Sequence, residues 1–132
     1  MKQRRGFTVV ELLIVIVIIA SLALLTVFAF GSWRERTART ELQQELSTVS
    51  ASLNNYRNFN NGYPGVAGGA PVSPTTLNGL VYRPNAGVTM TYSLRTDGLS
   101  YCLKATSVAV ASEPSWYIDS AVSATSTKIA CS

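Results

Sequence analysis

A long run without a single charged residue, Leu12 to Gly31, limits the fold of this chain more than any other feature. As an α-helix, about 20 residues span the ~30 Å hydrocarbon core of a bilayer. The run contains no proline, and within lipid a single segment can satisfy its backbone hydrogen bonds only as a helix. We therefore expect a membrane-spanning helix near the N-terminus.

The helical pattern continues past Trp33, a residue type common at membrane interfaces. Apolar residues then recur in alternating steps of four and three, which puts them on one helix face: Leu42, Leu46, Val49, Leu53 and Tyr56. The opposite face is polar, with Glu41, Gln44, Glu45 and Ser52. We predict one helix from Phe7 to about Arg57, whose second half needs a partner to cover its apolar face. A coiled-coil seam is the alternative use of that face, but the stripe is short for one.

The residues after the helix differ from it in composition. Asparagines and a glycine between residues 54 and 62, followed by Pro64, should end the helix. Residues 65–84 are rich in Gly, Pro, Ser and Thr and predict an irregular loop.

Strand patterns follow this loop. Residues 88–94 and 100–105 alternate and flank an Asp97-Gly98 turn, which predicts a β-hairpin. Residues 115–119 and 127–131 are weaker strand candidates. The expected fold is α+β: a long N-terminal helix, membrane-spanning in its first half and amphipathic in its second, packed on a small antiparallel sheet.

We expect five segments along the chain. These are a basic leader (residues 1–6), a transmembrane helix (7–31), its amphipathic continuation (32–58), a loop region (59–87) and a sheet region (88–132) that contains both cysteines.

The formal charge of +4 depends on the leader, which contributes Lys2, Arg4 and Arg5. Without these three, eight of the eleven basic residues remain against seven acidic ones, so nucleic-acid binding has little electrostatic support. The chain has no histidine, which excludes histidine-based catalysis. No nucleophile–base set or phosphate-binding loop is visible, so we expect neither an enzyme nor a cofactor.

Two cysteines, Cys102 and Cys131, predict one disulfide if the C-terminal part is exported. Two free structural thiols are the alternative. Asp97, Glu113 and Asp119 are candidate calcium ligands by residue type, but their spacing matches no calcium-loop motif, so no metal is expected. Trp116 and Tyr117 fit a strand core better than an adhesive surface patch.

Glu11 places a carboxylate inside an otherwise apolar segment. A charge near the middle of a bilayer costs about 3 kcal/mol or more, so a partner is needed. Cleavage after Gly6 would give Phe7 a free α-amine. That amine and Glu11 could neutralise each other, within one chain or between neighbouring chains.

The segment from Arg5 to Leu12 resembles the class III signal sequence of type IV prepilins and type II secretion pseudopilins. The resemblance implies that a prepilin peptidase cleaves after Gly6 and N-methylates Phe7. It also implies that Glu11 pairs with the terminal amine of an adjacent subunit during filament assembly. Residues 56–64 and 100–103 are similar to the family's helix end and to a strand that bears half of a C-terminal disulfide. Phe28 stands where many pilins have a helix-breaking proline.

By this resemblance, the chain is expected to be a pilin that polymerises into a type IV pilus. The alternative is a pseudopilin of a type II secretion-like machine. The expected partners are further copies, other pilins, the peptidase, an assembly platform in the cytoplasmic membrane, and membrane lipid. The C-terminal domain should lie outside the membrane before assembly and on a surface or extracellular filament afterwards.

The N-terminus also fits two simpler alternatives. The basic cluster and the small residues around Ala29 could form a conventional secretory signal, although the apolar run is long for one and Glu11 follows the cluster closely. A plain single-pass anchor is the second alternative, because cations flank both ends of the run.

Overall fold

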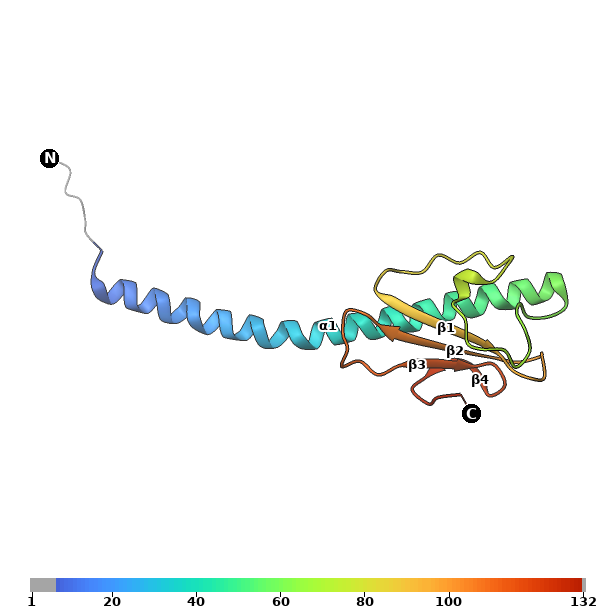
Figure 1. Ribbon diagram of the computed structural model, residues 1–132. Coiled ribbons are helices and arrows are strands. Elements are labelled where there is room, and N and C mark those ends of the chain that lie inside the picture. Colours follow the sequence, from blue (N-terminus) through green and yellow to red (C-terminus); the bar gives the residue numbers. More distant parts are fainter. Residues whose placement is uncertain (1–6, 132) are drawn as a thin grey trace. The chain divides into compact units, whose positions relative to one another are not determined.

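The computed structural model describes residues 7–131. These residues form helix α1 (Val9–Asn60), the short 3-10 helix η1 (Pro74–Thr76), and strands β1 (Val88–Leu94), β2 (Tyr101–Ser107), β3 (Trp116–Asp119) and β4 (Ser123–Thr127), all labelled or visible in Figure 1. The chain divides after Arg34 into two compact units, an N-terminal unit and a globular unit that begins at Glu35. Each unit is described separately.

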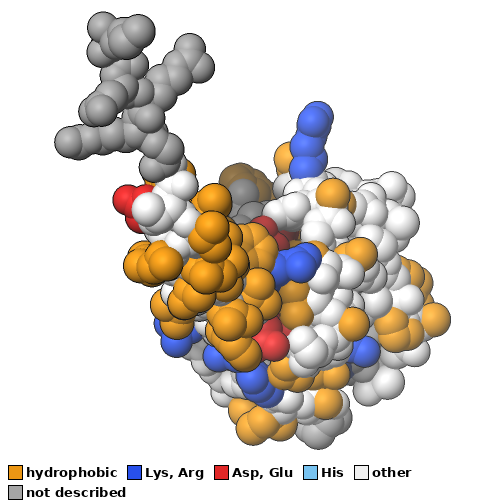
Figure 2. Space-filling view, turned by 90° about the vertical axis from the view of Figure 1, so that its left-hand side faces the viewer, with side chains coloured by type: hydrophobic (Ala, Val, Ile, Leu, Met, Phe, Trp, Pro, Cys, Tyr) orange, Lys and Arg blue, Asp and Glu red, His pale blue; other side chains and the backbone are white. Residues whose placement is uncertain are grey.

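The N-terminal unit is the apolar part of α1. It contains a stretch with a mean hydropathy of 3.1 over 18 residues, long and apolar enough to cross a membrane, and that stretch is not buried by the protein itself. In space-filling view the start of α1 presents a nearly continuous hydrophobic surface (Figure 2). Three hydroxyls bond to the carbonyl three residues earlier, at 2.8 Å for Ser21, 2.7 Å for Thr26 and 3.2 Å for Ser32. These hydroxyls therefore need no external partner in lipid.

The globular unit is held together by one core between α1 and the sheet. Four residues of the predicted helix stripe are fully buried, Leu42, Leu46, Val49 and Leu53, whereas the fifth, Tyr56, is only partly buried. Tyr92, Tyr101, Leu103 and Ile118 from the strands are buried with them. Two tyrosine hydroxyls find partners in this core: that of Tyr101 bonds Ser50 at 2.7 Å, and that of Tyr92 donates to the Pro64 carbonyl at 2.8 Å. The predicted α+β fold, with the amphipathic helix packed on an antiparallel sheet, is confirmed.

The sheet is an antiparallel meander in the order β1-β2-β3-β4. The β1–β2 hairpin pairs Val88 with Ser107 and Leu94 with Tyr101. Its turn follows the predicted chemistry, because Asp97 Oδ1 accepts the Leu99 amide at 2.9 Å and Gly98 adopts a φ of 66°. Beyond β1, the 65–84 loop covers the sheet edge through a bridge between Val72 and Tyr92.

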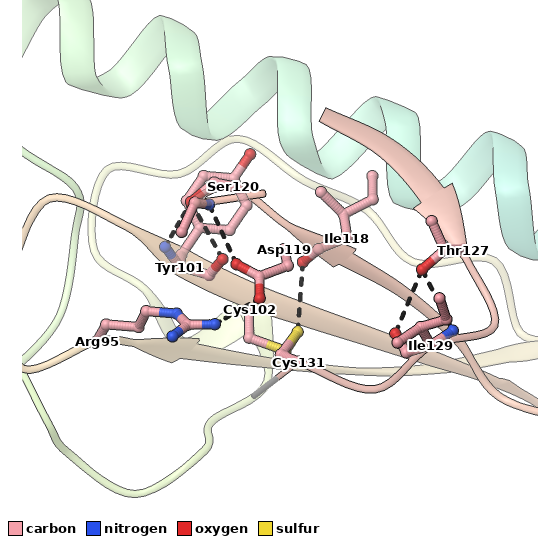
Figure 3. Close-up of a disulfide and its surroundings, with 10 residues drawn as sticks. Arg95, Tyr101, Cys102, Ile118, Asp119, Ser120, Thr127, Ile129 and Cys131 are labelled. Atoms are coloured by element: carbon pink, nitrogen blue, oxygen red, sulfur yellow. Dashed lines mark hydrogen bonds and ion pairs between the residues drawn. A yellow bond between two sulfur atoms is a disulfide. The ribbon is translucent and has the colours of Figure 1, made fainter. Parts of the chain in front are cut away.

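The fourth strand differs from the prediction. We expected a strand at residues 127–131, and that was wrong, because β4 ends at Thr127. The following residues leave the β3 edge so that Cys131 can meet Cys102, which lies on β2, one strand further into the sheet (Figure 3). A tail that crosses β3 in this way cannot continue as its neighbour. A register shift between Tyr117 and Asp119 also limits β4.

Candidate functional site

The segment that precedes and opens α1 carries the predicted processing and assembly residues. Gly6 lies outside the residues that the structure describes. Phe7 is 79% exposed and stands two residues before the first helical residue, Val9. Glu11 lies in the first helical turn, where a negative charge interacts favourably with the helix dipole.

Thr8 and Glu11 form a reciprocal capping pair at the start of α1. The Thr8 amide and hydroxyl both donate to Glu11 Oε2, at 2.9 Å and 2.8 Å, and the Glu11 amide donates to Thr8 Oγ1 at 3.3 Å. This is a capping box, in which an N-terminal threonine and a glutamate three residues later satisfy each other's backbone donors. This role of Glu11 was not among the predictions, although the Thr-x-x-Glu spacing is its usual signature.

The capping pair leaves one oxygen of the carboxylate available. Both bonds from Thr8 end on Oε2, and within residues 7–131 no hydrogen bond to Oε1 is found. A carboxylate can accept hydrogen bonds on both oxygens. Glu11 can therefore keep the helix cap and still accept a bond from a cation outside the described part of the chain.

The second predicted pair, Cys102 and Cys131, is joined by a disulfide with a Cα–Cα distance of 6.0 Å. Cys102 lies opposite Asp119 in the β2–β3 pairing. Asp119 also forms an ion pair with Arg95, which follows β1 (Figure 3). The bridge and the ion pair thus tie the C-terminal tail, β2, β3 and the β1–β2 turn together at one place.

The three acidic residues that were candidate calcium ligands have separate partners. Asp97 accepts bonds from Ser100 and Leu99, which hold the pKa of its carboxyl below the usual value. Asp119 binds Arg95 and the Ala121 amide. Within the described residues, no group of three metal-binding side chains comes together.

Glu113 is the most buried of these carboxylates, with a side chain only 3% exposed. Arg39 Nε donates to its Oε1 at 3.2 Å, Trp116 Nε1 donates to the same oxygen at 3.1 Å, and Lys128 Nζ lies 3.9 Å away. Burial alone would raise the pKa of Glu113. The hydrogen bonds from Arg39 and Trp116 and the charges of Arg39 and Lys128 outweigh burial and hold that pKa below its usual value.

Two comparisons with known proteins found matches. A family model described as the prokaryotic N-terminal methylation motif matches residues 1–27. The type II secretion system core protein G of Klebsiella pneumoniae is 33% identical over 86 residues, which cover 65% of this chain and 56% of that relative. The chain thus matches little more than half the length of this relative. No solved structure matches the chain.

Proposed function

We propose that the chain is a member of the type IV pilin and pseudopilin family and, within it, a pilin subunit of a type IV pilus; the methylation motif and the similarity to a secretion-system core protein support this. The observation that carries the proposal is the carboxylate of Glu11, held at the start of an exposed apolar helix with Oε1 still able to accept a bond. This geometry suits a subunit that meets a cation of its neighbour when apolar helices pack together.

Processing prepares the N-terminus for this contact. Hydrolysis of the Gly6–Phe7 peptide bond removes the basic leader and leaves an α-amine on Phe7, which is then N-methylated. The methylated amine keeps its positive charge and can bind Glu11 Oε1 of an adjacent subunit. An incoming subunit that misplaces Glu11 would bury an unpaired charge, which is strongly unfavourable, so this contact sets the axial register.

The subunit waits in the cytoplasmic membrane, anchored by the apolar part of α1, with the globular unit outside. A prepilin peptidase and an assembly platform in that membrane are its processing and assembly partners. During assembly the apolar helices exchange lipid contacts for tight packing against other copies and other pilins. The disulfide between Cys102 and Cys131 supports an exported globular unit, because such bonds persist in oxidising compartments.

A pseudopilin of a type II secretion-like machine is the second candidate, favoured by the identity of the relative. The two functions differ in the length and location of the filament: a pilus is long and lies on the cell surface, whereas a pseudopilus is short and stays in the periplasm. Imaging of material sheared from intact cells should show long filaments containing this chain if it builds a surface pilus. A short periplasmic filament would leave sheared material free of the chain and would favour the pseudopilin.

The proposal is tested by the mass of the N-terminal peptide from native cells. A peptide that starts at Phe7 and carries one added methyl group is expected. An intact Met1 would instead indicate a plain membrane anchor, and a start near Phe30 would indicate a conventional secretory signal; either result contradicts the proposal. A Gly6→Leu variant should remain unprocessed, whereas a correctly trimmed variant would show that the cleavage site is misassigned.

A further inference from the structure

Two asparagines of the globular unit, Asn61 and Asn78, are each followed by a glycine. In this dipeptide an asparagine side chain loses ammonia most readily, because glycine has no Cβ to obstruct attack on that side chain by the next amide nitrogen. Both asparagines are exposed, and in the described part of the chain neither glycine amide donates a backbone hydrogen bond. The two sites are therefore alike in sequence and differ in their surroundings.

Asn61 follows the last residue of α1, and the peptide after it has open space around it. The Asn61 amide donates to the Arg57 carbonyl at 2.8 Å, and the residue adopts the left-handed conformation of a helix end, with a φ of 57°. A methyl group added to Gly62 would meet no atom within 4 Å. The Asn61–Gly62 peptide can therefore rotate until the Gly62 nitrogen faces the Asn61 side chain.

Asn78 lies in a closed turn. The Leu80 amide donates to the Leu77 carbonyl at 3.2 Å, and Gly79 has a φ of 84°, as the third residue of a type II turn requires. The ring of Tyr56 lies against this glycine, since a methyl group added to Gly79 would lie 3.0 Å from Tyr56 Cε2. Rotation of the Asn78–Gly79 peptide therefore requires the turn to open.

We propose that Asn61 is a site of spontaneous deamidation in the folded protein and that the closed turn protects Asn78. The Gly62 nitrogen, after losing its proton to hydroxide, attacks Cγ of Asn61. A new N–Cγ bond closes a succinimide ring, and the Cγ–Nδ2 bond breaks, so that Nδ2 leaves as ammonia with a proton taken from water, which restores the hydroxide. A water molecule then opens the ring at either carbonyl and leaves aspartate or isoaspartate. One water molecule is consumed and one ammonia released overall.

Both products change the end of α1. Each adds a negative charge just past the C-terminal end of the helix, where the helix dipole disfavours it. Isoaspartate also inserts one carbon into the main chain before Gly62. The next residue, Tyr63, packs edge-on against Tyr101 with ring centroids 4.8 Å apart, and its hydroxyl donates to Asn54 at 3.1 Å. A longer main chain displaces Tyr63, so the modification loosens the junction between α1 and the loop that follows it.

The test uses the purified full chain in detergent micelles, incubated at mildly alkaline pH in heavy-oxygen water, which labels each product. Chymotrypsin cleaves after Tyr63 and so separates the two sites for mass spectrometry. In the folded chain we expect deamidation at Asn61 to be about fivefold faster than at Asn78 or more, the factor that one turn hydrogen bond represents. In urea the turn is lost, and the two rates should converge.

Two variants serve as controls. Gly62→Ala should slow the reaction at Asn61 to the rate at Asn78 or below while the chain stays folded, because the added methyl group has open space. Asn61→Gly removes the reactive side chain and suits the left-handed conformation. Incubation should therefore leave its hydrogen exchange in residues 62–66 unchanged, whereas the native chain should exchange faster there as the product accumulates.

Three outcomes would overturn the inference. Equal rates at the two sites in the folded chain, or faster reaction at Asn78, would show that the turn gives no protection. A difference that persists in urea would show that the fold does not cause it. Unchanged exchange in residues 62–66 of a fully deamidated native chain would exclude a loosened helix end. None of these results bears on the proposed function, because the inference concerns the globular unit alone.

Discussion

The two oxygens of the Glu11 carboxylate differ in their contacts. Oε2 accepts the capping bonds from Thr8, whereas Oε1 can still accept a bond from another group. We predict that Glu11→Leu leaves the protein membrane-held but lowers filament yield more than tenfold. The neighbour's amine then loses its partner in an apolar core, where breaking a buried charge pair costs about 3–5 kcal/mol. Quantitative immunoblots of sheared filaments and of membranes measure both effects.

The matched control is Thr8→Val, which removes the capping hydroxyl but keeps the carboxylate. Its filament yield should stay within about twofold of the native yield, since loss of one cap costs about 1 kcal/mol and the helix is long. Equal loss of filaments in both variants would mean that capping, rather than charge pairing, is the essential role of Glu11.

Glu113 gives the globular unit a specific acid sensitivity. Because its pKa is lowered in the folded state, its charge stabilises the fold above the unfolded value of about 4.3, and this contribution is lost as pH falls through the folded pKa. We predict that Glu113→Gln lowers the free energy of unfolding by about 1–2 kcal/mol at neutral pH. Its stability should also change less than that of the native protein between about pH 5 and pH 3. Urea unfolding across this range measures both, and a variant with the native pH profile would contradict the assignment.

At the scale of elements, the C-terminal tail is positioned by a covalent bond rather than by pairing in the sheet. We predict that Cys102→Ser/Cys131→Ser lowers the free energy of unfolding by about 3–4 kcal/mol, by the chain-entropy estimate for a loop of this length. Hydrogen exchange should rise most in residues 128–131, while the Leu42 to Leu53 face of α1 stays protected. Native urea midpoints in the double variant would show that β4 and the Arg95–Asp119 pair hold the tail without the bridge.

The same elements show what the sequence could and could not predict. The helix stripe was predictable because it depends on local periodicity alone. The β1–β2 hairpin was predictable because it depends on local alternation and on one turn, Asp97-Gly98. β4 was not, because its Ser, Ala and Thr residues carry no apolar alternation and its position depends on pairing with β3. The bonds around Glu113 were also unpredictable, since they join residues far apart in the chain, Arg39 and Lys128 among them.

At the scale of the whole molecule, the two units differ in how they place their apolar side chains. The N-terminal unit exposes nearly every apolar side chain. The globular unit encloses a core to which α1 and each of the strands β1, β2 and β3 contribute residues. The residues of that core all follow Glu35, so its packing does not depend on the apolar segment. Folding of the globular unit thus depends on the second part of α1, whereas the proposed filament contacts depend on the first part.

This separation predicts the behaviour of a fragment that begins at Glu35. It should fold as a soluble monomer with the disulfide intact, because the whole core and the Glu113 cluster are retained. It should not enter filaments, since it lacks Glu11 and the apolar surface that packs against other copies. Sedimentation, thermal unfolding and addition of the fragment to assembling cells test these points. Incorporation of the fragment into filaments would show that contacts between globular units suffice for assembly, and a fragment without cooperative unfolding would show that the core depends on the N-terminal unit.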